Sequence, residues 1–332
     1  MIEENENKKP ETYIIEPTEP KNSNSDYEQL ADQYDNFPPK PVEARQEKSI
    51  HTSIISFLLF FGAFYFLFKW DIQSIIALSV VLFIHELGHY LAMRIYNYKD
   101  LGMFFIPLLG AFVTGEEDKV SQKQRTIILL AGPLPGIIIG IALFFIGLNL
   151  NNPLLLKASN IFIFLNLFNL LPMMPLDGGK VIKTMFFDSN EIINTVFVVL
   201  SIILLSLLAF FQKSYIFLLI PVFLAMQLNT QMQIEKTRKS LKKINLDLNK
   251  TYKELTNREY WQIRAGIVSN MKVFSDINPN DYSYSHKEPQ IFNMLKQVIN
   301  KKPLNDIGFL GKTVITLIWI LSFIVPIAII IL

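Results

Sequence analysis

One short motif has residue types and spacing that suit metal chemistry, His85-Glu86-Leu87-Gly88-His89. Residues four apart lie on the same face of an α-helix, so the imidazoles of His85 and His89 can bind one Zn²⁺. The carboxylate of Glu86 can then hold a water molecule and accept its proton. An ordinary pair of helical histidines would show the same spacing, so the surroundings of the motif decide between the two interpretations.

The motif lies within an apolar stretch, with residues 79–84 before it and 91–93 after it. Ionisable side chains are costly inside a membrane helix, and those that occur there mark functional sites. We therefore interpret His85 and His89 as zinc ligands and Glu86 as the catalytic base.

The composition indicates a membrane protein. Of 332 residues, 51% are hydrophobic and 18% are charged, whereas soluble domains have about 25% charged residues. The chain contains no cysteine, which excludes disulfides and thiolate metal sites. Any metal must therefore be bound by His, Asp, Glu or Asn side chains.

Seven apolar runs predict an all-α polytopic membrane protein with about seven transmembrane helices, since each run approaches the roughly 20 residues that a bilayer requires. They cover 53–69, 73–96, 126–149, 154–175, 191–211, 214–228 and 311–332. The apolar stretch 101–115 is too short to span and contains Gly102, Pro107, Gly110 and Gly115. It predicts a short re-entrant membrane β-hairpin, with an interfacial loop as the alternative.

The chain divides into four predicted parts. Residues 1–50 form a disordered, acidic, proline-containing N-terminal tail, because 1–49 hold twelve Asp and Glu but few large apolar residues. Residues 51–228 form a six-span membrane domain with its catalytic core at about 73–185. Residues 229–308 form a basic cytosolic amphipathic helical segment, and 309–332 a C-terminal transmembrane helix.

Two of these parts leave alternatives open. Within the tail, Tyr34-Asp35-Asn36-Phe37-Pro38-Pro39-Lys40-Pro41 suits either an extended linker, which we favour, or a docking motif. In the segment 229–308, apolar residues recur every seven positions at Ile234, Leu241, Leu248 and Leu255. This period predicts a helix from about 228 to 262 whose apolar stripe lies on the helical bundle or the membrane surface.

The distribution of basic residues predicts the topology. Residues 229–308 hold fourteen Lys and Arg against eight Asp and Glu, and the connection 97–125 is also basic. The positive-inside rule then gives a multi-pass cell-membrane protein with a cytoplasmic N-terminus and His89 in the cytosolic half of the bilayer. The basic segment contains no recognisable nucleic-acid-binding module, so we expect the lipid bilayer, not nucleic acid, to attract it.

A catalytic zinc site requires a third protein ligand besides the two histidines. Asp177 is the candidate, because it follows the fourth apolar run at the predicted depth of His89. The prolines and glycines of 172–179 free the backbone to direct it inward. An Asp that only caps a short helix is the alternative.

Two separated segments resemble the site-2 protease family of intramembrane zinc metalloproteases, peptidase family M50. One is the motif at His85–His89; the other, Asn169-Leu170-Leu171-Pro172-Met173-Met174-Pro175-Leu176-Asp177-Gly178-Gly179, is similar to the family's Asn-Leu-hydrophobic-Pro-x-x-Pro-Leu-Asp-Gly-Gly segment. The resemblance implies one zinc ion per chain with His85, His89 and Asp177 as ligands. It also implies Glu86 as catalytic base and a role for Asn169 in holding the substrate or polarising its carbonyl. Gly136 departs from the pattern, since many members have Asn there.

The predicted function is a zinc-dependent intramembrane endopeptidase. Its substrates would be membrane proteins or membrane-embedded peptides, cleaved within or next to transmembrane segments. The first alternative is a transporter that uses the intramembrane His, Asp and Asn residues as an ion path. The second is a zinc-binding scaffold without hydrolytic activity. Both alternatives would tolerate Glu86→Gln, which a protease would not.

Overall fold

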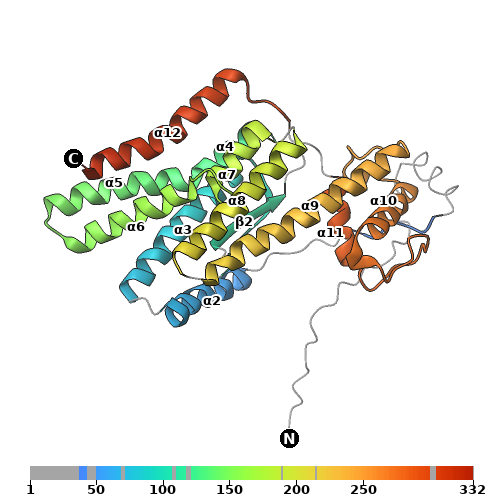
Figure 1. Cartoon of the computed structure of the whole chain (residues 1–332), viewed down its shortest axis with the longest axis horizontal. Helices are drawn as coiled ribbons and strands as arrows, with labels where there is room; N and C mark the ends of the chain where they lie inside the picture. The colour runs from blue at the N-terminus through green and yellow to red at the C-terminus, as the bar shows by residue number, and fades with distance from the viewer. Residues whose placement is uncertain are drawn as a thin grey trace, which may run out of the picture. The chain divides into compact units, whose positions relative to one another are not determined.

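The computed structural model describes residues 37–42, 50–68, 72–106, 110–116, 121–187, 190–213, 215–299 and 304–331. The chain forms two compact units. Glu47–Leu228 and Pro303–Leu332 make up the first, which we call the membrane unit; Met1–Gln46 and Asn229–Lys302 make up the second, which we call the small unit. Figure 1 labels most of the elements of both.

The membrane unit is mainly helical, as its apolar composition predicts. Its helices are α2 (Ile50–Phe68), α3 (Ile72–Ile95), α4 (Gln122–Ala131), α5 (Pro133–Asn149), α6 (Pro153–Asn169), α7 (Asp177–Ile182), α8 (Glu191–Phe211) and α12 (Phe309–Ile331). A π-helical turn, Lys183–Phe187, continues α7. Helix α9 (Leu219–Lys243) follows the 3₁₀ turn Tyr215–Leu218 and runs from the membrane unit into the small unit.

Five helical segments in the described part of the chain are long and apolar enough to cross a membrane. They are Ile72–Ile95, Gln122–Asn149, Glu191–Phe211, Tyr215–Lys243 and Phe309–Ile331. The predicted helical membrane protein is confirmed, whereas the predicted count of seven spans is not. The two remaining apolar runs form shorter apolar helices, Ser53–Ala63 within α2 and Pro153–Asn169.

The predicted hairpin is present. Strands β1 (Lys99–Ile106) and β2 (Gly110–Glu116) pair antiparallel. Phe105 of β1 is buried against Phe57 and Phe60 of α2, and its N–H donates to Ser56 Oγ at 3.1 Å. The outer edge of β1 is therefore in contact with α2 at this point.

Small residues let the helices around α3 approach closely. A Cβ atom added at Gly88 of α3 would lie 2.0 Å from the carbonyl oxygen of Ala131 at the end of α4. Between α5 and α6, a Cβ at Gly140 would lie 2.6 Å from Ile163, and Ser159 Oγ donates to the Gly140 carbonyl at 2.8 Å. Glycine contacts of this kind bring membrane helices to short separations. The first contact fixes α3 against the end of α4, and the second fixes α5 against α6.

The small unit has its own hydrophobic core. It contains the 3₁₀ turn Tyr252–Glu254, α10 (Asn257–Asn270), the 3₁₀ turn Lys272–Phe274 and α11 (Glu288–Val298). Buried core residues from α9, α10, α11 and the chain between α9 and α10 include Leu241, Leu248, Leu255, Ile263, Ile267, Ile291 and Leu295.

The predicted continuous helix from about 228 to 262 is wrong. Helix α9 ends at Lys243, and Asn245 then adopts a φ of 59°, a left-handed conformation that terminates helices. Leu248 and Leu255 reach the core from chain outside any helix. The seven-residue period therefore marks the core of the small unit, not a surface stripe.

A salt bridge links the start of α10 to the chain before it. Lys250 Nζ lies 2.6 Å from Glu259 Oε1. Burial raises the pKa of Glu259, but hydrogen bonds from Lys250 and Thr256 outweigh it, so the pKa falls below the ordinary value of 4.5. The same pair raises the pKa of Lys250. The folded small unit thus favours the charged form of Glu259.

Residues 37–42 are part of the small unit and contact its residues beyond 229, so the expected disordered tail does not describe them. Lys40 N–H donates to Asn257 Oδ1 at 2.8 Å, and Pro41 is buried. The rest of the predicted tail, 1–36 and 43–49, lies outside the described residues. The other predicted boundaries stay predictions.

Candidate metal centre

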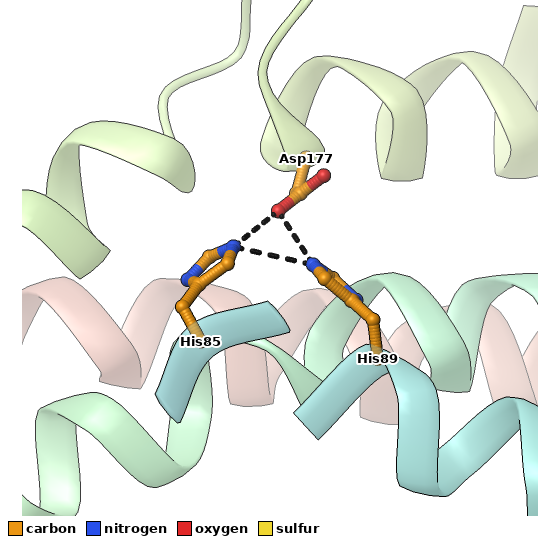
Figure 2. A group of neighbouring side chains, drawn as sticks. All are labelled: His85, His89 and Asp177. Atoms are coloured by element: carbon orange, nitrogen blue, oxygen red, sulfur yellow. Dashed lines mark hydrogen bonds and ion pairs between the residues drawn. The ribbon is translucent and has the colours of Figure 1, made fainter. Parts of the chain in front are cut away.

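Three side chains point toward one another inside the membrane unit (Figure 2). His85 and His89 come from α3, and Asp177 is the first residue of α7. Asp177 Oδ2 lies 2.9 Å from His85 Nε2 and 3.1 Å from His89 Nε2, and the two Nε2 atoms are 3.2 Å apart. All three residues are buried, with 2%, 7% and 6% exposure.

The two histidines meet because they are four residues apart on one helical face. Asp177 reaches them because the chain folds tightly between α6 and α7. A Cβ at Gly178 would lie 1.9 Å from the Leu170 carbonyl oxygen, and one at Gly179 would lie 2.3 Å from that of Met173. Only glycine fits at these two positions. The Pro-Leu-Asp-Gly-Gly pattern thus has a structural reason.

Neighbouring helices hold this fold in place. The Met174 N–H donates to Ser201 Oγ of α8 at 3.0 Å. Trp319 of α12 donates its indole N–H to the Leu170 carbonyl at 2.9 Å. Two helices, α8 and α12, therefore anchor the segment that presents Asp177.

Hydrogen bonds to the far side of each imidazole fix its protonation. Asn166 Nδ2 donates to the Phe162 carbonyl at 2.7 Å, which turns Asn166 Oδ1 toward His85. His85 Nδ1–H then donates to Asn166 Oδ1 at 2.8 Å, and His89 Nδ1–H donates to the Ile128 carbonyl at 2.7 Å. Since Nδ1 carries the proton in both rings, both Nε2 atoms present lone pairs to the centre of the site.

This donor set fits a zinc ion. Two Nε2 lone pairs and a carboxylate oxygen would repel one another at these separations unless a cation lay between them. Ligands at about 2.0–2.1 Å from a tetrahedral metal are about 3.3 Å from each other, and the three observed separations are 2.9–3.2 Å. Asp177 Oδ1 is paired with Lys180 Nζ at 3.1 Å, so only Oδ2 faces the histidines. His85, His89 and Asp177 together could hold one metal ion.

The two other predicted site residues, Glu86 and Asn169, lie on different helices and differ in burial. Glu86 is buried, with 5% exposure, and lies on α3 directly after His85. Asn169 is half-buried at the end of α6, and its Nδ2 donates within the helix to the Leu165 carbonyl at 3.2 Å. The predicted catalytic roles of both residues stay predictions.

Sequence reasoning missed the residues that support the histidines. Asn166 is a fully buried polar residue in the apolar helix α6, and an intramembrane asparagine one turn before Asn169 was the available signal. Lys180, three residues after Asp177, was a second signal, because residues at this spacing are neighbours on a helix. The sequence could not indicate the hydrogen bond from His89 to the Ile128 carbonyl, because every residue type has a backbone carbonyl.

Two glycines at the start of α5 leave room for the site. A Cβ at Gly132 would lie 2.3 Å from His89 Nε2, and one at Gly136 would lie 2.2 Å from Asn166 Nδ2. Many members of the family have Asn at the position of Gly136. The glycine provides the space that the Asn166 side chain occupies beside His85.

Comparison with known proteins agrees with this geometry. Residues 73–160, which include the His85–His89 motif, Gly132 and Gly136, match the model of peptidase family M50. A zinc metalloprotease of Methanocaldococcus jannaschii is 34% identical over 119 residues, which are 34% of this chain and 34% of that protein. Stage IV sporulation protein FB of Bacillus subtilis is 28% identical over 118 residues, 34% of this chain and 40% of that protein.

The chain thus spans less than half the length of these relatives. The solved site-2 protease of M. jannaschii is 25% identical with a TM-score of 0.40, covering 53% of this chain and 87% of that one. The segment that holds the His85–His89 motif matches peptidase family M50, and the predicted resemblance to the site-2 protease family of intramembrane zinc metalloproteases is confirmed.

Proposed function

We propose that the protein is a zinc-dependent endopeptidase that hydrolyses peptide bonds within or next to transmembrane segments. The observation that carries this proposal is the buried triangle of His85 Nε2, His89 Nε2 and Asp177 Oδ2 within apolar helices. The M50 match over 73–160 supports peptide hydrolysis as the chemistry.

The residues of the chain would divide the reaction between them. His85, His89 and Asp177 would hold zinc, which when bound supplies a Lewis acid that polarises a carbonyl and acidifies water. Glu86 would accept the proton of the attacking water and deliver a proton to the leaving amine. Asn169 would donate its Nδ2–H to the substrate carbonyl oxygen as negative charge develops there.

The same proposal includes the topology. Helices α2 and α6 would also cross the bilayer, giving seven spans, and both basic connections would then face the cytosol. His89 lies nearer than His85 to Arg94, the basic residue in the last turn of α3. The metal centre would accordingly lie in the cytosolic half of the bilayer.

The hairpin would present the substrate. Antiparallel partners alternate between exchanging hydrogen bonds and directing their N–H and C=O groups outward. Phe105 directs its N–H outward to Ser56, so it belongs to a pair that points its backbone groups outward. Its partner Ala111 therefore also directs its N–H and C=O groups outward, and so do Met103 and Val113, which form the next pair of this kind. With the β1 edge against α2, an unwound substrate segment would pair with Ala111 and Val113 of β2.

Paired proline variants test the presentation step. Val113→Pro removes an outward N–H from β2 and should reduce cleavage, whereas Met103→Pro removes the equivalent group from β1 and should have less effect. Equal cleavage by the two variants would contradict pairing with β2.

Glu86→Gln tests the reaction itself. Purified wild type and variant are reconstituted in liposomes with membrane peptides that accumulate in cells producing the variant. We expect cleavage to fall by 10²–10⁴-fold, the range for a general base, with zinc content unchanged. Glu191→Gln, on the exposed first turn of α8, is the matched control. Undiminished cleavage by Glu86→Gln would contradict Glu86 as the catalytic base, and a wild type that cleaves none of the peptides would contradict the protease and favour an ion path.

A further inference from the structure

The small unit holds a proline-rich segment of its own chain, residues 37–42 (Phe-Pro-Pro-Lys-Pro-Val), which we call the proline strap. Figure 1 draws it in blue beside α10. Three prolines in six residues favour the extended polyproline II conformation, which has no internal hydrogen bonds. The partners of its main-chain groups therefore reveal the kind of site that receives it.

Side chains of the small unit bind the main chain of the strap. Trp261 Nε1–H donates to the Pro38 carbonyl at 2.8 Å, Tyr284 Oη–H to the Pro39 carbonyl, and Tyr252 Oη–H to the Pro41 carbonyl. Proline has no N–H, so Lys40 supplies the single N–H between 38 and 41, and it donates to Asn257 Oδ1 at 2.8 Å. Indole and phenol donors thus contact three of four successive residues.

The side chains of the strap give it direction and register. Phe37 packs edge-on against Tyr282, with ring centroids 4.9 Å apart. Lys40 Nζ lies 5.3 Å from the centroid of the Tyr252 ring and donates to the carbonyls of Tyr252 and Lys253, both at 3.1 Å. An aromatic residue at one end and a lysine near the other therefore each have a dedicated contact.

The groove that receives the strap is built on the core of the small unit. Trp261 is 1% exposed, and the Arg264 guanidinium lies 4.9 Å from the centre of its ring. Arg264 is in turn held by the buried carboxylate of Glu288. The outer residues of the groove stay accessible with the strap in place, since Tyr282 is 45% and Tyr284 38% exposed.

We propose that Tyr252, Asn257, Trp261, Tyr282 and Tyr284, the aromatic groove, form a binding site for polyproline II peptides with a Pro-Pro-Lys-Pro core. Aromatic grooves whose donors contact prolyl carbonyls are a recurring way to bind proline-rich segments. The strap is the ligand in cis, and a proline-rich segment of a partner protein competes with it. Tethering gives the strap a millimolar effective concentration, so the partner must bind at high local concentration or the strap must first be released. The proposal does not depend on the protease activity.

Fluorescence anisotropy with a labelled Asn-Phe-Pro-Pro-Lys-Pro-Val peptide, the sequence of residues 36–42, tests the groove in the full-length detergent-purified chain. The strap variant carries Pro38→Ala, Pro39→Ala and Lys40→Ala together. We expect it to bind the peptide with an apparent Kd at least tenfold lower than the wild type, whose groove is occupied. A peptide of the same composition in scrambled order should not bind.

Two phenylalanine substitutions distinguish specific from nonspecific binding of the peptide. Tyr252→Phe with Tyr284→Phe in the strap variant removes two donors but little volume, and should weaken binding by tenfold or more, at about fivefold for each hydrogen bond. Tyr215→Phe, on an exposed tyrosine of the membrane unit, should change nothing. A folded strap variant that does not bind the peptide, or binds equally after the double substitution, would overturn the proposal.

A second measurement keeps the strap intact in case its variant fails to fold. The chain has no cysteine, so Val42→Cys, at a position 45% exposed, accepts a single spin label. The label should be immobile in the free chain and become mobile as unlabelled peptide is added in the millimolar range. A spectrum unchanged by peptide, with the label immobile throughout, would show that the strap does not exchange and would refute competition in trans.

Discussion

Gly132→Ala should weaken zinc binding although it adds only one methyl group. Gly132 has a φ of −73° and a ψ of −65°, so alanine fits its backbone conformation. The added Cβ, however, would lie 2.3 Å from His89 Nε2 and 2.5 Å from its Cε1. Non-bonded atoms prefer about 3.5 Å, so the ring must move by about 1 Å.

The imidazole cannot make this movement without losing its other contacts. Its Nδ1–H is held at 2.7 Å by the Ile128 carbonyl, and its Nε2 is 3.1 Å from Asp177 Oδ2. Disturbing the partners of a metal-binding histidine weakens metal affinity by about 10–100-fold, and a 1 Å misplacement in a catalytic site costs about 100-fold in rate. We expect Gly132→Ala to show losses of this size in zinc affinity and in cleavage.

Competition with a zinc chelator, together with thermal unfolding, measures the effect. Gly62→Ala is the matched control, because a Cβ there meets nothing within 4 Å and alanine favours the helix. It should keep wild-type affinity. If Gly132→Ala also binds zinc as tightly as the wild type, the inferred packing of His89 against the start of α5 is wrong.

Three other outcomes follow from the described contacts. Asn166→Ala should weaken zinc binding by about 10–100-fold, because the His85 ring loses its acceptor, whereas the exposed Asn160→Ala on the same helix should not. Arg264→Met should destabilise the small unit by about 3–5 kcal/mol in thermal unfolding, because it leaves the buried Glu288 carboxylate without its partner; a Glu288→Gln second substitution should recover part of the loss. The pKa of Glu259 is depressed in the fold, so its stabilising contribution is full above pH 4.5 and is lost as pH falls through the folded pKa; Glu259→Gln should make unfolding less sensitive to acid in that range.

Different results would contradict each of these expectations. Equal zinc affinity of the Asn166 and Asn160 variants would mean that Asn166 does not position His85. An Arg264→Met chain that unfolds at the wild-type temperature would show that the Arg264–Glu288 pair adds nothing. Acid sensitivity identical in Glu259→Gln and wild type would assign the effect to other carboxylates.

Much of the membrane unit could be predicted because its signals are local. Runs of apolar residues indicate helices whatever their neighbours are, and glycines and prolines mark where the backbone turns. The hairpin followed from Gly102, Pro107, Gly110 and Gly115 in an apolar stretch too short to span. His85 and His89 share a helix face by spacing alone, and Asp177 was identified because zinc requires a further ligand.

The missed features depend on contacts between distant segments. The seven-residue period of Ile234, Leu241, Leu248 and Leu255 has no signature that distinguishes a long helix from a folded core. The support that Asn166 gives to His85 requires α3 and α6 to pack together. Packing of the proline strap on Trp261 joins residues 223 positions apart, and no local pattern predicts such a pairing.

Metal content of the purified full-length protein tests the central claim most directly. We predict one zinc ion per chain in the wild type and a large loss in Asp177→Ala, because its Oδ2 completes the triangle with both histidines. Asp276→Ala, at an exposed carboxylate of the small unit, should keep the wild-type content. A wild-type chain that binds no zinc after reconstitution, or an Asp177→Ala chain that retains all of it, would contradict the three-ligand metal centre.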